Sequence, residues 1–249
     1  MTAPTKWFDS VQSNGAARLR LFCFAHAGGA ASFFAHWSRR LPADVEVWPI
    51  QLPGRWARWR EEPLRDLVAA SGVLARELTP ELTAKPYLFY GHSLGGLIAY
   101  ETTLRLREQG RAMPKALVIS GRTPPDAPPS RPPLHRLPDE AFIRGIAEHY
   151  EAVDARLLAD PETRAMVLKV LRADLQMFET YRALTAAPLD LPIWAFAARG
   201  DRAAAPSSMD GWKRFSTREV ELHEFDGGHF FVRNNELVWR QLSDVLART

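Results

Sequence analysis

The stretch PYLFYGHSLGGLIAYETTLRL, residues 86–106, decides the fold of this chain. It begins with a short run of aromatic and aliphatic residues, which is typical of a buried strand. After Ser93 the apolar residues recur three and four positions apart, which predicts a helix. The turn between the two segments, GHSLGG, places glycines on both sides of the serine. Strand, tight turn and helix in this order predict a serine raised above the end of a sheet.

This turn matches the Gly-X-Ser-X-Gly pattern of a nucleophile elbow and makes Ser93 the candidate nucleophile. The serine of such an elbow has a strained backbone, and residues without a Cβ let neighbouring backbone pass close to it. The bare pattern also arises by chance, so the flanking strand and helix carry the prediction. The alternative is a glycine-rich turn in which Ser93 has no chemical role.

The rest of the chain repeats the alternation of strand and helix. Apolar runs that predict strands lie at 19–24, 45–51, 86–90, 116–120, 192–197 and 219–225. Segments with helical spacing include 64–80, 94–109 and 234–247. This alternation predicts an α/β protein with a mainly parallel sheet flanked by helices on both faces, which with the serine turn is the α/β-hydrolase fold.

The alternation breaks once, which predicts an inserted helical lid at approximately 122–187 within a single domain spanning 1–249. The insertion opens with the proline-rich stretch TPPDAPPSRPP, residues 123–133, which is expected to form a stiff, extended hinge. Helical patterns follow near 138–150 and 161–184. The second begins with Asp160 as N-cap and Pro161 at the first helical position.

A serine hydroxyl needs a base, and α/β-hydrolases supply the acid and then the histidine after the serine in chain order. His229 follows the last predicted strand and is the candidate base, whereas His223 lies within that strand and His92 precedes the serine. Asp201 follows the strand at 192–197 and is the candidate acid that orients the imidazole. Asp226 is the competing acid, and a simple loop turn is the alternative role for Asp201.

Hydrolysis of an acyl group also requires two donors for the oxyanion. The amide of Leu94, next to the nucleophile, is the first candidate. The second is the amide of Ala27 in the loop AHAGGA, which follows the strand at 19–24. His26 in the same loop is a candidate substrate contact.

Composition narrows the class of protein without naming a function. The 249 residues carry a formal net charge of only +3, and no basic tract suggests nucleic acid. The start, MTAPTKWFDS, lacks the apolar core of a signal peptide, and no stretch is long enough to span a membrane, so a cytoplasmic protein is expected. Cys23 is the only cysteine and lies in an apolar run, which favours a buried thiol over a nucleophile.

An ordered set of motifs resembles the type II thioesterases of polyketide and nonribosomal peptide synthesis, and the resemblance covers nearly the whole chain. The motifs are FCFAHAGGAASFF (22–34), QLPGRWARWREEP (51–63), YGHSLGGLIAYE (90–101), VISGRTPP (118–125), LRADLQMFETYR (171–182), LPIWAFAARGDR (191–202) and FDGGHFF (225–231). GHSLGG occurs in many hydrolases, whereas HAGG, the PGR loop, the LRADLQMFETYR segment and GGHFF are more specific as a set.

The resemblance implies a discrete enzyme that removes stalled or aberrant acyl groups from the phosphopantetheine arm of acyl or peptidyl carrier proteins. It implies Ser93 as nucleophile with Asp201 and His229, and an oxyanion hole formed by the amides of Ala27 and Leu94. Neither a metal nor a diffusible cofactor is expected, and we expect a monomer. The rival interpretations are a general carboxylesterase or acyltransferase with the same triad, and a non-catalytic binding protein, which would be expected to lack a triad member.

Two sets of side chains outside the triad are candidates for binding. Met177, Phe178 and Tyr181 in the lid are candidate substrate-lining residues, or they form the lid's own core. Trp56 and Trp59 of the PGR loop either flank the entrance or pack internally. Arg55, Arg58 and Arg60 in the same loop either meet an acidic carrier protein or face solvent.

Overall fold

The computed structural model describes the chain except for residues 1–5, 9–10, 12–13, 129–131, 151–158 and 184. Its centre is a six-stranded sheet with the order β2-β1-β3-β4-β5-β6, in which all neighbouring strands are parallel. The strands are β1 (Leu19–Phe24), β2 (Val45–Pro49), β3 (Tyr87–His92), β4 (Leu117–Ser120), β5 (Ile193–Ala198) and β6 (Val220–Phe225). Each overlaps a predicted apolar run, and the predicted α/β fold is confirmed.

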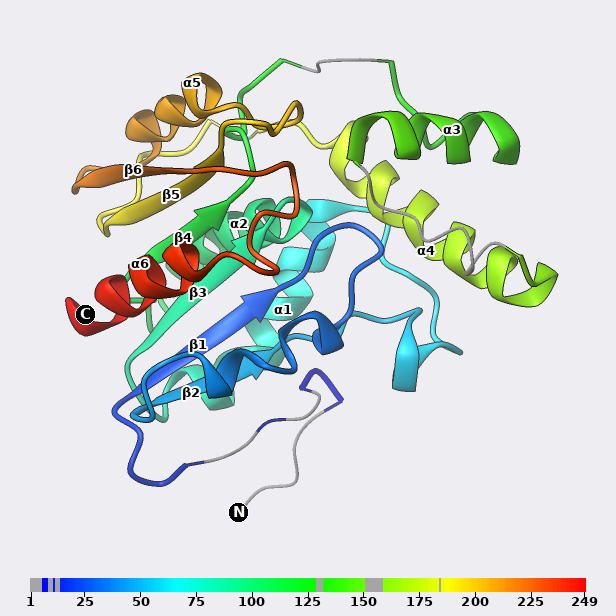
Figure 1. The fold of residues 1–249 in the computed structure, drawn as a ribbon. Coiled ribbons are helices and arrows are strands. Elements are labelled where there is room, and N and C mark those ends of the chain that lie inside the picture. Colours follow the sequence, from blue (N-terminus) through cyan, green and yellow to red (C-terminus); the bar gives the residue numbers. More distant parts are fainter. Residues whose placement is uncertain (1–5, 9–10, 12–13, 129–131, 151–158, 184) are drawn as a thin grey trace.

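Helices cover both faces of this sheet (Figure 1). The longer ones are α1 (Leu67–Leu82), α2 (Leu94–Glu108), α3 (Asp139–Tyr150), α4 (Pro161–Thr180) and α6 (Glu236–Ala247). Short helical turns are α5 (Pro206–Met209) and the 3₁₀ segments Ala31–Phe34, Trp37–Arg39, Trp56–Arg58 and Asp210–Phe215. Within the described ranges, no helix is both long and apolar enough to cross a lipid bilayer.

The alternation of side chains along β3 explains the two layers. Phe89 packs in the cluster formed with α1 and α2, whereas Tyr90 packs in the opposite cluster, which includes Trp37 and residues of α6. Every residue of β3 is buried because both faces of the sheet are covered. The helix predicted from residue 64 begins at Leu67 instead, because the carboxylate of Asp66 caps it by accepting from the amide of Ala69 at 2.8 Å.

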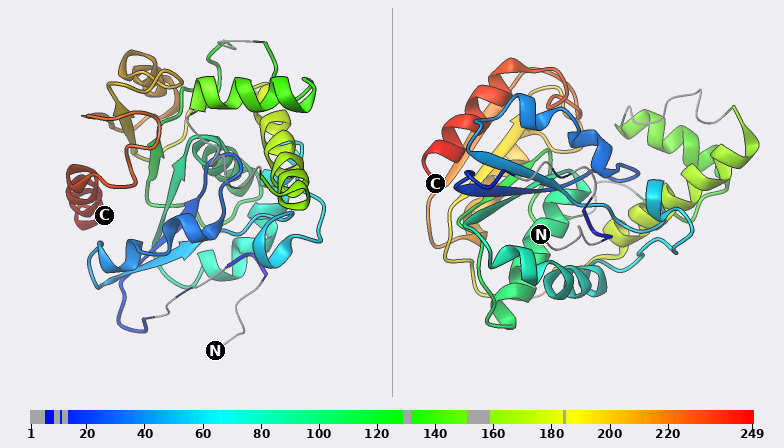
Figure 2. Two further views of the ribbon diagram at one scale, coloured as in Figure 1. Left: turned by 45° about the vertical axis from the view of Figure 1, so that its right-hand side comes forward. Right: turned by 90° about the horizontal axis from the view of Figure 1, so that it is seen from below.

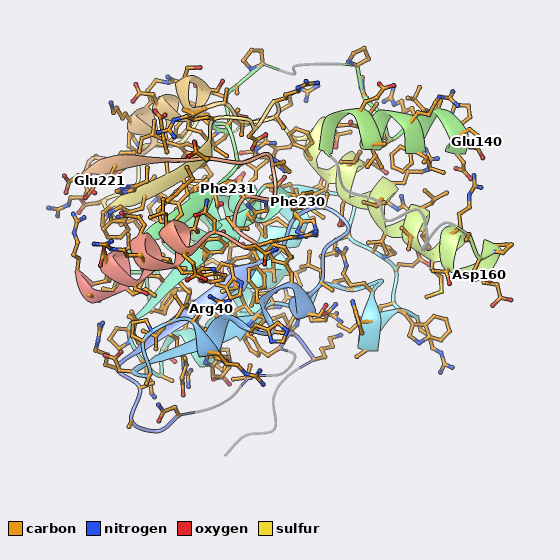
Figure 3. All side chains as sticks on the ribbon, in the orientation of Figure 1. Arg40, Glu140, Asp160, Glu221, Phe230 and Phe231 are labelled. Atoms are coloured by element: carbon orange, nitrogen blue, oxygen red, sulfur yellow. The ribbon has the colours of Figure 1, made fainter. Side chains whose placement is uncertain are left out.

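The helices α3 and α4 stand beside the carboxyl end of the sheet, between β4 and β5 in sequence (Figures 1 and 2). The Asp160 carboxylate accepts from the amide of Thr163 at 2.8 Å and caps α4, whose last residue is Thr180. A small apolar cluster joins the two helices through Leu134, Phe142, Ile146, Leu168, Leu171 and Leu175. Figure 3 shows Glu140 and Asp160 at the outer ends of the pair.

Two segments of the predicted lid lie partly outside the described residues. In the proline-rich hinge, 129–131 are outside, and the described part of 123–133 contains no regular helix. Residues 151–158, between the two helices, are also outside. Between Gly121 and Pro188, the described residues contain no strand, as the sequence pattern predicts.

Candidate active site

Ser93 occupies the sharp turn between β3 and α2. Its backbone has a positive φ, of +56°, with ψ of −120°. Such a conformation is strained for a residue with a side chain and persists only where the surroundings hold it. The Ser93 amide donates to the carbonyl of Ser120 at the end of β4 at 2.8 Å, which ties the turn to the neighbouring strand.

The glycines on both sides of Ser93 are required by close backbone contacts. A Cβ on Gly91 would lie 2.2 Å from the carbonyl oxygen of Gly95. A Cβ on Gly95 would in turn lie 2.1 Å from the carbonyl oxygen of Phe24 in β1. Real Cβ atoms do not approach this closely, so the GHSLGG pattern reflects the packing of α2 on the ends of β1 and β3.

The structure brings Ser93, His229 and Asp201 together in one hydrogen-bonded line. The Nε2 atom of His229 lies 2.9 Å from Ser93 Oγ, and its Nδ1 atom lies 2.8 Å from Asp201 Oδ2. The other oxygen of Asp201 accepts from the amides of Ala203 and Ala204 at 2.8 and 3.1 Å. These amides orient the carboxylate, and all three triad side chains are buried.

The competing residues lie elsewhere. Asp226 is exposed and binds the Nη1 atom of Arg199 at 2.7 Å. His223 is half-buried on β6, with its Nε2 atom 3.3 Å from the Glu221 carboxylate. His92 is fully buried behind the triad, where its Nδ1 atom lies 3.0 Å from Ser120 Oγ. Of these histidines, His229 is therefore the one placed to act on Ser93.

Two uncharged histidines, His26 and His92, lie near His229. Burial, followed by the positive charge of Arg233, lowers the pKa of His26 to about 3. Burial likewise holds the pKa of His92 well below its ordinary value of 6.5. The His92 ring packs against that of His229 with centroids 5.2 Å apart. Near pH 7 both rings are therefore uncharged.

The two predicted oxyanion donors border the same cavity as Ser93. Leu94 is the first residue of α2, so its amide has no partner within the helix. In the loop after β1, the Gly28 amide donates to Asp174 and the Gly29 amide donates to the carbonyl of His26. Among the described residues, no hydrogen-bond partner occupies the Ala27 amide. The loop thus leaves this amide available to a bound substrate.

A narrow cavity opens above Ser93, between the sheet and the α3–α4 pair. The space between atoms here is about 430 Å³, part of which is open to solvent. The wall on the side of the two helices is apolar and consists of Ile146, Leu171, Leu175 and Phe178. The opposite wall includes His26 and Phe230, and Arg122 also borders the cavity. Figure 3 shows Phe230 on the loop that follows β6.

Comparison with known proteins identifies the family. A model of the thioesterase domain matches residues 19–246. The chain belongs to the thioesterase family. Gramicidin S biosynthesis protein GrsT of Aneurinibacillus migulanus is 36% identical over 247 residues, covering 97% of this chain and 96% of that protein. Thioesterases hydrolyse thioester bonds, so the enzyme class predicted from the motifs is confirmed.

Two solved structures of thioesterases resemble this one closely. RedJ, from the prodiginine pathway of Streptomyces coelicolor, is 34% identical with a TM-score of 0.85, covering 98% of this chain and 90% of that one. YbtT, a type II thioesterase of the yersiniabactin NRPS/PKS pathway, is 28% identical with a TM-score of 0.81. The alignment covers 95% of this chain and 93% of YbtT. The resemblance to type II thioesterases inferred from the motifs is therefore confirmed.

Only part of the predicted substrate-lining set borders the cavity. His26 and Phe178 border the cavity, whereas Met177 and Tyr181 pack into the core beside α1 and α2. Residues 171, 175 and 178 are spaced four and three apart, so their side chains lie on one face of α4. That face borders the cavity. Met177 lies off that stripe, and Tyr181 follows the end of α4. The sequence prediction did not include Leu171 and Leu175. Their helical spacing from Phe178 is the pattern that could have indicated them.

The PGR loop also differs from its predicted role. Arg55 and Arg58 are buried, with exposed fractions of 6% and 5%. Arg55 binds Asp174, and Arg58 donates to Glu61 and to the Gln51 carbonyl, so neither arginine is available to a partner at the surface. Trp56, Trp59 and Arg60 remain exposed. The guanidinium of Arg60 lies over the ring of Trp59, 4.8 Å from its centroid.

Proposed function

We propose that this thioesterase uses Ser93, His229 and Asp201 to hydrolyse acyl thioesters on the phosphopantetheine arm of acyl or peptidyl carrier proteins. The observation that carries the proposal is the 2.9 Å contact between His229 Nε2 and Ser93 Oγ at the base of a largely apolar cavity. The biosynthetic context of GrsT, RedJ and YbtT supports carrier-bound acyl groups as substrates. Removal of stalled or aberrant groups is then the biological task.

In the acylation step, Ser93 Oγ attacks the thioester carbon while His229 Nε2 takes the hydroxyl proton. The amides of Ala27 and Leu94 donate to the oxygen that becomes negatively charged in the tetrahedral intermediate. Asp201 stabilises the imidazolium and holds its Nδ1–H toward the carboxylate. When the carbon–sulfur bond breaks, the proton on His229 passes to the departing thiolate, which leaves as the thiol, and an acyl-Ser93 ester remains.

Water completes the reaction. His229 takes a proton from the water molecule as its oxygen attacks the acyl-Ser93 carbonyl carbon, and the same two amides stabilise the second oxyanion. Collapse of this intermediate returns the proton to Ser93 Oγ and releases the carboxylic acid. Each step uses groups of the chain and water, so we propose that neither a metal nor a diffusible cofactor takes part.

We further propose that the α3–α4 pair acts as a lid that sets acyl preference. Its four apolar side chains form one wall of the cavity, so movement of the pair would change the length of acyl chain that the cavity admits. A complete triad within one chain supports a monomer as the active form. We place the enzyme in the cytoplasm, together with the carrier proteins that it serves.

The test compares the wild type with Ser93→Ala on short acyl groups loaded on a holo carrier protein, and on the same acyl groups as simple esters. We expect serine-dependent hydrolysis that favours the carrier-bound thioester. Cleavage of the simple ester alone would instead indicate a general carboxylesterase. Activity that survives in Ser93→Ala would contradict the mechanism.

A further inference from the structure

The loop that carries the Ala27 amide is a tight turn with one defined peptide orientation. The Gly29 amide donates to the carbonyl of His26 at 2.9 Å, which closes a four-residue turn. Gly28, the third residue, has φ of +74°, whereas φ of Ala27 is not positive. This combination defines a type II turn, in which the central peptide is flipped relative to the commoner type I turn.

A buried ion pair holds this turn from outside. The Oδ2 atom of Asp174, on α4, accepts from the Gly28 amide at 2.7 Å. The guanidinium of Arg55, in the PGR loop, binds both oxygens of Asp174 at 2.8 Å. The Nη1 atom of Arg55 also donates to the carbonyl of Gly29 at 2.9 Å. Two consecutive residues of the turn are thus held by two elements that are far apart in the sequence.

We propose that Asp174 and Arg55 are positioning residues that hold the Ala27 amide in place as an oxyanion donor. The inference rests on the oxyanion role assigned to that amide above. Asp174 faces the N–H of the Ala27–Gly28 peptide and therefore favours the flipped orientation of the turn. Without the carboxylate this peptide can rotate, and the adjoining Ala27 amide moves with it. Displacement of a hydrogen-bond donor by about 1 Å lowers the catalytic rate by up to about 100-fold.

The ion pair also links the donor to the lid. Asp174 belongs to α4, and Leu171 of the same helix packs so closely on the turn that a Cβ on Gly28 would lie 2.4 Å from Leu171 Cδ2. The side chain of Asp174 is fully buried and that of Arg55 is 6% exposed, so water does not replace either partner. The thioesterase therefore has its oxyanion donor in place only while α4 is docked on the turn.

The main test replaces the pair by apolar residues of similar size, Arg55→Met with Asp174→Leu. Such a double replacement commonly preserves the fold, because it leaves no unpaired buried charge. The control is Arg20→Met with Glu46→Leu, since these residues form another buried ion pair, 2.9 Å long, between β1 and β2. This pair also binds Glu81 and Lys85, so the melting temperature of the control is measured together with its kcat. Arg55→Lys is a milder variant that keeps the charge but loses the two-pronged bond to Asp174.

We expect the Arg55/Asp174 double variant to lose about 10- to 100-fold in kcat while KM changes less than about threefold. The Arg20/Glu46 control keeps the wild-type kcat, and Arg55→Lys lies between the two. Affinity for a trifluoromethyl ketone, which forms a tetrahedral oxyanion adduct with Ser93, falls in parallel with kcat/KM. If Arg55 and Asp174 only stabilised the fold, the variants would have a lower melting temperature but no parallel loss of ketone affinity and kcat/KM.

Either of two results would overturn the inference: a folded double variant with wild-type kcat, or a reduced kcat with unchanged affinity for the ketone. Each variant is measured on the carrier-bound thioester and on a simple ester of the same acyl group. If the wild type cleaves only the ester, the proposed carrier substrate is wrong, and the comparison on the ester still decides the role of the ion pair.

Discussion

The Nε2 atom of His229 lies 2.9 Å from Ser93 Oγ, although 136 residues separate them in the chain. The turn after β3 presents the serine, and the loop after β6 presents the imidazole, because the carboxyl ends of parallel strands meet at one edge of the sheet. Asp201, in the loop after β5, lies on the other side of the imidazole, with its Oδ2 atom 2.8 Å from His229 Nδ1.

Replacement of Asp201 by asparagine tests this line directly. An amide in place of the carboxylate favours the wrong imidazole tautomer and cannot stabilise the imidazolium, so we expect kcat to fall by roughly 10⁴-fold. The matched control is Asp226→Asn, which changes an exposed carboxylate bound to Arg199 and should leave kcat unchanged. Rates of thiol release from an acyl thioester measure both variants. Equal rates for Asp201→Asn and the wild type would exclude Asp201 as the triad acid.

We have proposed that the wall formed by α3 and α4 sets the acyl preference. Ile146, on α3, borders the cavity and is almost fully buried, so Ile146→Trp fills space that an acyl chain needs. We expect kcat/KM for an octanoyl thioester to fall about 10-fold more than that for an acetyl thioester. Met166→Trp, on the exposed face of α4, is the control and should leave the ratio unchanged. An unchanged ratio in Ile146→Trp would place the acyl chain elsewhere.

The close packing of the serine turn predicts a large difference between two glycine-to-alanine changes. Gly91→Ala forces a Cβ against the backbone of Gly95, and we expect it to destabilise the protein by about 3 kcal/mol or more. Gly72→Ala adds a Cβ in open space within α1 and should stabilise by about 0.5–1 kcal/mol. Urea unfolding measures both free energies. Similar values for the two variants would contradict the close contacts described here.

The depressed pKa of His26 makes stability depend on pH. Unfolding restores the pKa from about 3 to 6.5, so between these values the unfolded chain binds a proton that the folded protein does not. Stability therefore falls as the pH falls below 6.5, by up to about 1.4 kcal/mol per pH unit for this group. His92 adds to the slope in the same direction.

His26→Asn isolates this contribution. The variant has no imidazole at this position, so its stability should fall less steeply than that of the wild type from about pH 7 to about pH 5. Urea unfolding at several pH values gives the two slopes. Parallel slopes would show that His26 binds its proton equally well in the folded and unfolded chain.

Much of the fold and the triad geometry could be predicted from local patterns. The strands follow from short apolar runs, and GHSLGG places Ser93 on a turn whose glycines the structure requires. Asp201 and His229 follow from the loops that succeed the last two strands. These features depend on residues close together in the chain, where spacing and turn chemistry determine the backbone.

The surroundings of the triad required the folded structure. Met177 and Phe178 are adjacent in sequence, yet one enters the core and the other borders the cavity, because the rotation of α4 decides which face meets the sheet. Arg55 belongs to a motif that suggests an exposed loop, yet it is buried against Asp174. No local pattern indicates which distant carboxylate an arginine will meet.

The sequence by itself determined the order of strands and helices, the serine turn and the candidates for acid and base, since each is a matter of local backbone geometry. Only the tertiary structure decided which side chains line the cavity and how the loop carrying the Ala27 amide is held. The physical reason is distance along the chain: Arg55 and Asp174 are 119 residues apart, and their pairing depends on the packing of the PGR loop against α4.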